Sequence, residues 1–230
     1  MTVTPGVLTL CCSDLAAPPL FWTDEDRRRH GYEPESAAAV AVALDVELRW
    51  LFKRWSDFRP ALEAGECDGI WCGSAITAER SRYFTYSEPY AIFHEGVVVR
   101  ADDPAVGAED LRGRRVGAIE ASTNMRLAES FPGVTTVAFS GVSDDVFGDM
   151  LTALRDGEVD AIVDDMPAFI DVEQNHPGIR LAFDVATNQR WGCAVRYGDV
   201  ETKALIDRGI AKADLRAVWE RTLPSLTFPL

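Results

Sequence analysis

The stretch Asp68-Gly-Ile-Trp-Cys-Gly-Ser-Ala-Ile-Thr-Ala-Glu-Arg80 joins a short apolar segment to a turn with small and hydroxyl residues. Its first five residues are typical of a short buried strand, and the rest is typical of a capped turn of helix. A chain that leaves a strand in this way presents free backbone N–H groups, and Arg80 adds a guanidinium suited to a carboxylate. Open α/β sheets bind ligands at the carboxyl ends of their strands. The stretch therefore predicts an anion site at a strand end.

Strand-like and helix-like segments alternate on both sides of this stretch. The alternation predicts an α/β fold with largely parallel sheets. Two comparable sets of segments are separated near Gly96 to Asp103, so we expect two lobes. The expected strands cover residues 7–12, 46–52, 68–72, 114–118, 135–139, 160–163 and 191–196, and the expected helices cover residues 33–44, 56–64, 122–130, 143–155, 167–174 and 200–223, the last with a break near Ala213-Asp214.

Composition and charge are those of a folded globular domain. Hydrophobic residues make up 47% of the 230 residues and charged residues 26%, which is enough apolar material for a core without disulfides. The net charge of −14 repels nucleic acid and anionic membranes, so neither is an expected partner. A run of charged residues at 24–30 lies in a turn-rich stretch before Gly31 and predicts a solvated hairpin tip.

The start of the chain bears on where the protein acts. Residues 1–10 contain no Lys or Arg, and their apolar run is too short for a secretory signal. No stretch approaches the length of a membrane span. We therefore expect a cytoplasmic protein if Met1 is the native start, and an extracytoplasmic one, periplasmic or at the cell surface, if a signal sequence has been removed.

Five cysteines lie in or beside apolar, strand-like runs. An odd number at these spacings indicates neither a disulfide framework nor a zinc site, so we expect buried thiols that act as small hydrophobic residues. Metalloprotease, nucleophile-elbow and P-loop patterns are absent from the sequence. The sequence therefore predicts no metal, no cofactor and no catalytic residue. The cysteines are Cys11, Cys12, Cys67, Cys72 and Cys193.

Two further strand ends carry polar residues that complete a site for a zwitterion. The segment Glu120-Ala-Ser-Thr-Asn124 lies at a second strand-to-helix junction, with hydroxyls and free amides. Asp164-Asp165 ends a third predicted strand, where a carboxylate could take an ammonium group. A clamp for an anion together with an acidic side chain fits an α-amino acid.

These motifs, in this order, resemble family 3 of the bacterial extracellular solute-binding proteins, the amino-acid-binding components of ABC importers. The resemblance extends almost from end to end. It implies a two-lobed fold of the type II periplasmic-binding-protein class, in which each lobe is a mostly parallel sheet flanked by helices. The segments that carry it are Asp14 with Pro18-Pro19, Gly31-Tyr-Glu-Pro-Glu35, Trp55-Ser-Asp-Phe-Arg-Pro-Ala-Leu62, Gly65-Glu-Cys-Asp-Gly69, Gly73 to Arg80, Tyr83-Phe-Thr-Tyr-Ser-Glu-Pro-Tyr90, Asp110-Leu-Arg-Gly-Arg-Arg-Val-Gly117, Ala121-Ser-Thr123, Leu154-Arg-Asp-Gly-Glu-Val-Asp-Ala161 and Asp165.

The resemblance also implies how the ligand α-carboxylate is held. Arg80 would clamp it from one lobe, helped by the backbone N–H of Ala75. The amides and hydroxyls of Ser122 and Thr123 would close on it from the other lobe.

The ammonium group and the side chain of the ligand have their own expected partners. Asp165 would take the α-ammonium group together with the Gly73 carbonyl. Trp55 would lie against the ligand side chain, and Asp14 would contact its polar end. The expected ligand-binding residues are thus Asp14, Trp55, Gly73, Ser74, Ala75, Arg80, Ser122, Thr123 and Asp165.

Hinge closure is the mechanism that the resemblance implies. Lobe 1 would comprise residues 1–96 and 194–230, lobe 2 residues 97–193, and the hinge would lie near residues 96–99 and 192–195. Closure removes water from the ion pairs to the ligand and thereby strengthens them. The expected protein is a monomer that binds an amino acid without catalysis and has an ABC permease as its partner.

Five residues depart from the family pattern, and two of them, Pro34 and Ser36, affect only the start of a helix. Ala17 stands where an aromatic residue is common, Ala75 where Ser or Thr is usual, and Ala121 where Gly is usual. Ala17 would leave room for a bulky ligand side chain. The pair Asp14 and Trp55 would suit a polar or cationic side chain, through charge pairing and cation–π contact.

Two other functions stay open at this point. Cyclohexadienyl (arogenate) dehydratases share the fold, but their catalytic glutamate falls at Ala168 of this chain, which leaves dehydration without a proton donor. The third alternative is a stand-alone amino acid sensor module.

Overall fold

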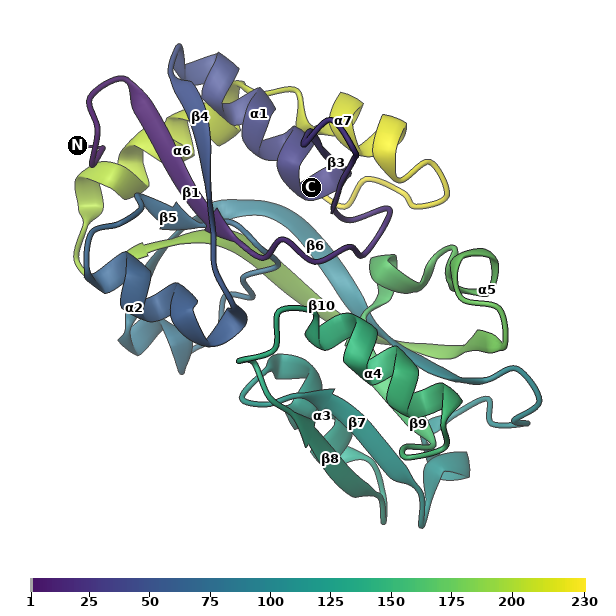
Figure 1. Ribbon diagram of the computed structural model, residues 1–230. Coiled ribbons are helices and arrows are strands. Elements are labelled where there is room, and N and C mark those ends of the chain that lie inside the picture. Colours follow the sequence, from purple (N-terminus) through teal and green to yellow (C-terminus); the bar gives the residue numbers. More distant parts are fainter. Residues whose placement is uncertain (1) are drawn as a thin grey trace. The chain divides into compact units, whose positions relative to one another are not determined.

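The structure is a computed structural model that describes residues 2–230, and it divides into two compact units. Unit 1 contains the described residues up to Asp14, then Leu20–Ile92 and Gln189–Leu230. Unit 2 contains Leu15–Pro19 and Phe93–Asn188. Figure 1 shows that helices pack on strands in each unit, which confirms the predicted α/β class.

Unit 1 is built on three parallel strands, β4 (Glu47–Phe52), β1 (Val7–Cys12) and β5 (Gly69–Ile70). Leu10 in the middle strand pairs with Trp50 on one side and with Gly69 on the other. All six residues of β1 are buried, as expected for a strand covered on both faces. The other elements of unit 1 are β2 (Trp22–Thr23), β3 (Arg29–His30), α1 (Tyr32–Leu44), α2 (Phe58–Glu63), α6 (Val200–Lys212), α7 (Leu215–Thr222) and the short 3-10 helices η1 (Trp55–Asp57) and η2 (Arg80–Arg82).

Helix α1 packs closely against α6 and α7 within unit 1 (Figure 1). The approach to α6 depends on Gly209, where an added Cβ would lie 2.7 Å from Val40 and 2.9 Å from Leu44. All five cysteines belong to unit 1 and are buried and unbridged, which confirms the prediction of buried thiols.

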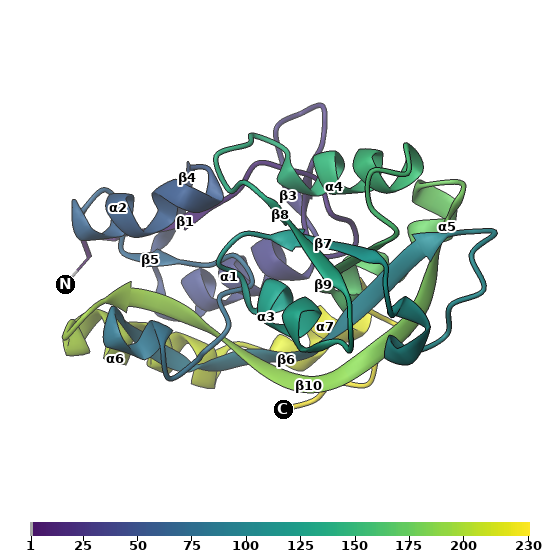
Figure 2. The same cartoon turned by 90° about the horizontal axis from the view of Figure 1, so that it is seen from below.

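Unit 2 is built on β7 (Arg115–Ile119), which lies between two parallel neighbours, β8 (Thr135–Phe139) and β9 (Ala161–Asp165). Helix α3 (Thr123–Ser130) and helix α4 (Val146–Arg155) pack on opposite faces of these strands (Figure 2). The apolar residues of β7, β9 and α3 share one buried cluster. The remaining elements of unit 2 are η3 (Ala108–Leu111), η4 (Met166–Phe169) and α5 (Val172–Asn175).

Two long strands, β6 (Phe84–Arg100) and β10 (Ile179–Arg196), run through both units. Strand β10 pairs with β5 in antiparallel orientation, and β6 pairs with β9 in the same way. The strand order is β4-β1-β5-β10-β6-β9-β7-β8. The predicted lobe boundaries, 96/97 and 193/194, fall inside these long strands, while the compact units divide at 92/93 and 188/189. The hinge near residues 96–99 and 192–195 stays a prediction.

Most of the predicted helices and strands are confirmed to within a few residues, and three features differ. The predicted helix 167–174 is two short helices, because Asp171 leaves the helical region of the backbone (φ −110°, ψ 25°). Strand β10 begins twelve residues before the predicted strand 191–196, and β6 extends far beyond the short linking strand that was expected near residues 96–99. Pro89 and Gly96 lie inside β6, although both residue types are typical of strand ends rather than strand interiors.

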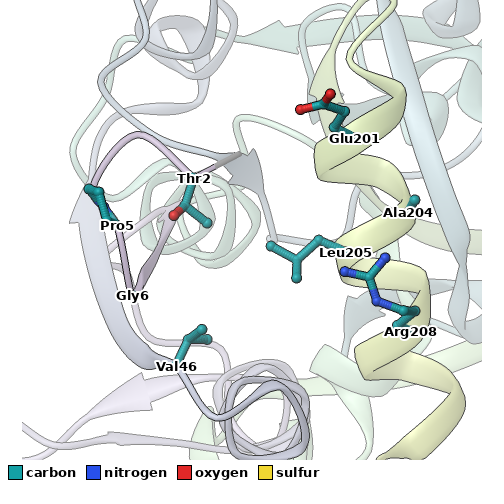
Figure 3. A pocket seen from close by; sticks show the side chains of 8 residues that line it. All are labelled: Thr2, Pro5, Gly6, Val46, Glu201, Ala204, Leu205 and Arg208. Atoms are coloured by element: carbon teal, nitrogen blue, oxygen red, sulfur yellow. The ribbon is translucent and has the colours of Figure 1, made fainter.

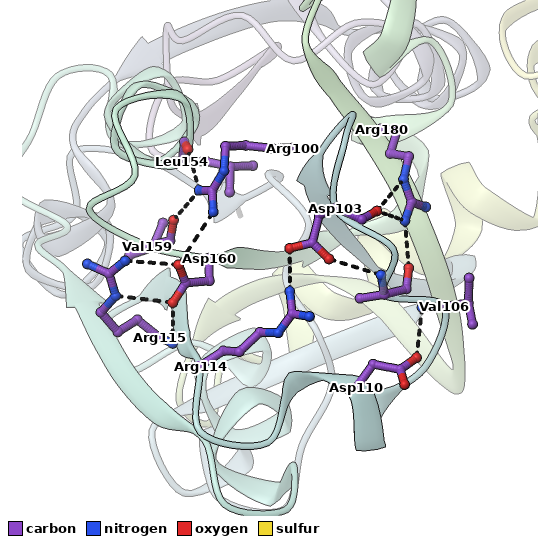
Figure 4. Close-up of polar contacts among 11 residues, drawn as sticks. Arg100, Asp103, Val106, Asp110, Arg114, Arg115, Leu154, Val159, Asp160 and Arg180 are labelled. Atoms are coloured by element: carbon purple, nitrogen blue, oxygen red, sulfur yellow. Dashed lines mark hydrogen bonds and ion pairs between the residues drawn. The ribbon is translucent and has the colours of Figure 1, made fainter.

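A network of arginines holds the amino ends of β7 and β9 together in unit 2 (Figure 4). Arg115 donates to both carboxylate oxygens of Asp160, from Nε at 3.1 Å and from Nη2 at 2.9 Å. Hydrogen bonding from Arg115 lowers the pKa of Asp160 to about 2. Arg100 Nη1 donates to the carbonyls of Leu154 and Val159, each at 2.9 Å. The motifs around residues 110–117 and 154–161 therefore serve the fold of unit 2.

The part of the chain that the structure describes contains no candidate for a membrane-spanning helix. Among residues 2–230, every helix is too short or too polar to pass through a bilayer.

Candidate ligand-binding site

The predicted residues of unit 1 follow the carboxyl ends of its parallel strands. Asp14 comes after β1, Trp55 comes after β4, and the segment 73–75 comes after β5. Because the three strands are parallel, their carboxyl ends lie at the same edge of the sheet. The structure therefore brings these residues to one edge of unit 1.

Arg80 is held beside two of its predicted neighbours. Its backbone N–H donates to Thr77 Oγ1 at 3.1 Å, which fixes the turn that begins η2. Its guanidinium donates from Nη1 to the Ala75 carbonyl at 3.5 Å and lies over the Trp55 ring, 5.4 Å from the ring centroid. The cation–π contact and the hydrogen bond to the carbonyl orient the guanidinium.

The segment 73–75 is fixed from several directions. Gly73 has a left-handed backbone (φ 57°), and its N–H donates to Glu33 Oε2 at 3.0 Å. Ser74 is buried, with its hydroxyl 3.4 Å from the hydroxyl of Tyr86. Ala75 forms a bridge with Trp191 whose hydrogen bonds are donated by the neighbouring residues Ile76 and Gly192. The bridge therefore leaves the Ala75 N–H to other partners, as the predicted role in carboxylate binding requires.

Glu33 in α1 is a residue that sequence reasoning did not assign to the site. Its side chain is fully buried and accepts hydrogen bonds from Gly73 N–H and from the Tyr90 hydroxyl, at 3.0 and 3.1 Å. Burial raises the pKa of Glu33 to about 7, although these two bonds and the nearby Arg29 act in the opposite direction. The sequence signal that could have indicated a buried acid is that Glu33 directly follows Gly31-Tyr32, where a buried helix begins.

Asp14 is surrounded by groups from the β2–β3 hairpin. Its side chain is 39% exposed and accepts a hydrogen bond from the Thr23 hydroxyl at 2.9 Å. Arg27 Nη2 lies 3.5 Å from Asp14 Oδ2, and Arg29 Nη1 lies 3.8 Å from Asp14 Oδ1. Residues 24–30 do form the predicted hairpin. The prediction that the run is solvated is wrong for Arg29, whose side chain is only 5% exposed because it packs on aromatic rings of unit 1.

In unit 2, Ser122 and Thr123 begin helix α3 directly after β7. Ser122 Oγ caps the helix by accepting the Met125 N–H at 2.9 Å, and its own hydrogen stays able to donate. The first turn of α3 presents backbone N–H groups that suit an anion. Ala121, which precedes the cap, has a left-handed backbone (φ 57°) that glycine adopts more easily, so the departure from the family pattern is strained.

Asp165 ends β9 and is half-buried. Strands β9 and β7 are parallel, so Asp165 lies at the same edge of unit 2 as Ser122 and Thr123. The neighbouring Asp164 is buried and accepts from the Asp165 N–H at 2.7 Å and from Asn124 Nδ2 at 2.9 Å. Burial raises the pKa of Asp164 to about 7. The alternation of a strand therefore gives the two adjacent acids different environments, and Asp165 is the accessible one.

A hollow of about 590 Å³ in unit 1 lies away from these residues (Figure 3). Gly6 and Val46 line it and precede β1 and β4, so the hollow is at the amino ends of those strands. Figure 3 shows Leu205 and Arg208 of α6 at its wall. The predicted ligand-binding residues of unit 1 belong to the opposite edge of the same strands.

The side chains of residues 2–230 contain no group of three or more His, Cys, Asp or Glu residues arranged to hold a metal ion.

A family model covers residues 10–217, and its description is bacterial extracellular solute-binding proteins, family 3. The chain belongs to this family. This match confirms the resemblance, and the two-lobed solved structures of relatives confirm the fold class. A probable histidine-binding protein of Neisseria gonorrhoeae is 22% identical over 212 residues, which are 90% of this family member and 78% of the relative.

Solved structures of an ancestral arginine-binding protein are similar to this solute-binding protein throughout. The arginine-bound structure has a TM-score of 0.83 and is 27% identical in sequence. The match covers 95% of this chain and 98% of the chain in that structure. The glutamine-bound structure has a TM-score of 0.84 and is 27% identical in sequence. That match covers 96% of this chain and 99% of the chain in the structure.

An enzyme is also among the relatives. The membrane-bound lytic murein transglycosylase F of Idiomarina loihiensis is 26% identical over 204 residues, which are 86% of this chain but 44% of the transglycosylase.

Proposed function

We propose that this family member binds a small α-amino acid by hinge closure, as the solute-binding component of an ABC transport system. The observation that carries the proposal is the arrangement of Arg80. Its guanidinium is oriented by Trp55 and by the Ala75 carbonyl at the carboxyl edge of the unit 1 strands. Planar guanidinium groups bind carboxylates through paired hydrogen bonds, which the α-carboxylate of an amino acid can accept.

Each unit supplies part of the proposed ligand contacts. In unit 1, Arg80 and the Ala75 N–H take the α-carboxylate, the Gly73 carbonyl contacts the α-ammonium group, and Trp55 contacts the side chain. In unit 2, the α3 N-terminus with Ser122 and Thr123 takes the carboxylate, and Asp165 takes the ammonium group. The support in unit 2 is that these residues share one edge of its strands, and that Asp165, unlike Asp164, is accessible.

Closure would occur where β6 and β10 pass from one unit to the other. The residues at which the compact units divide, 92/93 and 188/189, support a hinge slightly before the segments 96–99 and 192–195. Asn188 has a left-handed backbone (φ 51°) in β10 at this division. The segments 97–99 and 193–195 are buried throughout, which favours rigid strand there.

The proposed site acts by binding and not by catalysis. Ala168, at the position of the dehydratase glutamate, is buried in η4 and carries no group that can transfer a proton. Most of the named relatives are binding proteins, which supports the same interpretation. We further propose an extracytoplasmic location, a monomeric state and an ABC permease as partner, and membership of the family supports these proposals.

The experiment is a thermal-shift and calorimetric screen of the protein against the L-amino acids. A ligand present at a hundredfold excess over its Kd should stabilise the folded state by about 2.7 kcal/mol. Arg80→Ala should abolish the shift, while Arg82→Ala, a change at an exposed arginine in the same short helix, should leave it in place. A wild-type protein that none of the amino acids stabilises would refute the proposal, and so would an Arg80→Ala variant with an unchanged shift.

A further inference from the structure

The β2–β3 hairpin places two arginines around Asp14, the residue expected to contact the polar end of the ligand side chain. We propose that Arg27 and Arg29 neutralise Asp14 and make this chain select an amino acid with an uncharged side chain and reject a cationic one. The inference rests on the proposed function, and it specifies the class of ligand.

Both carboxylate oxygens of Asp14 already face cations of the chain itself. Oδ1 accepts the Thr23 hydroxyl at 2.9 Å and lies 3.8 Å from Arg29 Nη1, and Oδ2 lies 3.5 Å from Arg27 Nη2. Thr23 also accepts a hydrogen bond from Arg29 Nη1 at 3.2 Å, so the hydroxyl links the guanidinium to the carboxylate. A cationic ligand would therefore compete with two resident cations for one negative charge.

Arg29 is a fixed part of unit 1 and not a mobile surface group. Its Nη2 donates to the Ser13 carbonyl at 3.0 Å and lies 3.6 Å from Cys12 Sγ. Its guanidinium lies over the rings of Phe21 and Phe52, 5.4 and 5.3 Å from their centroids, with Trp50 at 6.0 Å. Because the side chain is only 5% exposed, ligand binding cannot displace it without moving this packing.

Trp55, the second group suited to a cationic side chain, is engaged in a similar way. The Arg80 guanidinium lies 5.4 Å from the centroid of its ring. A ring that already holds one cation offers less attraction to another, because the two positive charges repel each other. Both features that favoured a cationic ligand in the sequence are thus occupied by arginines of the chain.

The other charged groups of the hairpin are exposed at its turn or paired elsewhere, and Glu25, Asp26 and Arg28 are the exposed ones. Asp24 is paired with His30, with Nε2 and Oδ2 2.7 Å apart. Glu33 is buried beneath the Gly73 loop, where it is held by Gly73 and Tyr90. Asp14 and the two guanidinium groups next to it carry one negative and two positive charges, so this group of three side chains sums to one positive charge. The Asp14 carboxylate would in turn repel an anionic side chain at short range. An uncharged side chain can still form hydrogen bonds to Asp14 and Thr23.

Isothermal titration calorimetry with L-glutamine, L-arginine and L-glutamate tests the inference on the full chain. We expect wild-type protein to bind glutamine at least about tenfold more tightly than either charged amino acid. Arg29→Met should raise the affinity for arginine relative to glutamine by about tenfold, because it releases the Asp14 charge. Arg27→Met changes a side chain that is 72% exposed, so it should fold normally and give a smaller change in the same direction. Arg59→Met, an exposed arginine paired with Glu63, is the control for loss of a positive charge and should leave the ratio unchanged.

The outcomes separate this inference from the proposed function. Arginine or glutamate binding as tightly as glutamine would overturn the inference and leave amino acid binding intact. The same holds if Arg27→Met and Arg29→Met leave the arginine-to-glutamine ratio unchanged. If none of the twenty L-amino acids binds wild-type protein in the thermal screen, the proposed function fails and the inference fails with it.

Discussion

Replacing Glu33 with glutamine should flatten the dependence of stability on pH. Glu33 is fully buried beneath the Gly73 segment, and burial raises its pKa from 4.5 to about 7. In the unfolded chain the group ionises near its ordinary value. Between these two pH values the folded state binds more protons than the unfolded state, so the free energy of unfolding falls as the pH rises. The stabilising contribution is complete below pH 4.5 and is lost by about pH 7.

The expected size of the effect follows from the two pKa values. A difference from 4.5 to about 7 corresponds to roughly 3 kcal/mol for a group that is fully buried. Over an accessible interval, from about pH 5 to about pH 8, wild-type protein should lose about 2–3 kcal/mol more stability than Glu33→Gln. The glutamine carbonyl can still accept the bonds from Gly73 and Tyr90, so the variant should fold.

The assay is urea denaturation of both proteins at a series of pH values. Comparing the two proteins at each pH isolates Glu33, because all other titrating groups are shared. Glu35→Gln, two residues further along α1, is the matched control for the substitution itself, since the Glu35 side chain is not fully buried and pairs with Arg221. Parallel pH profiles for wild type and Glu33→Gln would refute the reasoning that the buried acid is protonated near neutral pH.

Three other changes have expected outcomes. Asp164→Asn should also reduce the loss of stability between about pH 4 and about pH 7, since burial raises the pKa of Asp164 to about 7; an unchanged profile would contradict this. Asp160→Asn should destabilise unit 2 by about 1–3 kcal/mol above pH 4 and have little effect near pH 2. The reason is that the stability gained from the lowered pKa of Asp160 is lost as the pH falls from 3.8 to about 2. Denaturation of the variant and the wild-type protein at both pH values checks this prediction. Ala121→Gly should raise stability by up to about 1 kcal/mol by relieving the left-handed backbone, and a lower Tm would argue against strain there.

The sequence was sufficient to predict which residues follow the carboxyl ends of the strands. Apolar runs such as Val7–Cys12 and Thr135–Phe139 have the length and composition of strands, and their predicted bounds are confirmed. Once the strands are parallel, Asp14, Trp55 and Gly73 must share an edge, and so must Ser122 and Asp165. The predicted members of each half-site could therefore be grouped before any coordinates were known.

The features that could not be predicted from the sequence depend on packing between distant segments of the chain. Strand β6 contains Pro89 and Gly96, and its extent depends on pairing with β9, a segment more than sixty residues away. Glu33 was assigned only to a helix, because its two hydrogen-bond donors come from Gly73 and Tyr90, far along the chain. A single sequence pattern does not report such partners, so the buried acid beneath the site was missed.

Arg29 shows why a motif can locate a site residue and still misjudge its chemistry. The position of Asp14 follows from β1 alone, and the motif suggested that its charge was available to a ligand. That charge is instead shared with a guanidinium held by Phe21, Phe52 and the Ser13 carbonyl, which belong to separate segments of unit 1. A run of three arginines looks solvated in sequence because nothing local distinguishes Arg29 from Arg28. The fold distinguishes them, since Arg29 lies in β3 whereas Arg28 lies before that strand and is exposed. Ligand selectivity in this chain is therefore expected to depend on Arg29, a residue outside every motif that placed the chain in its family.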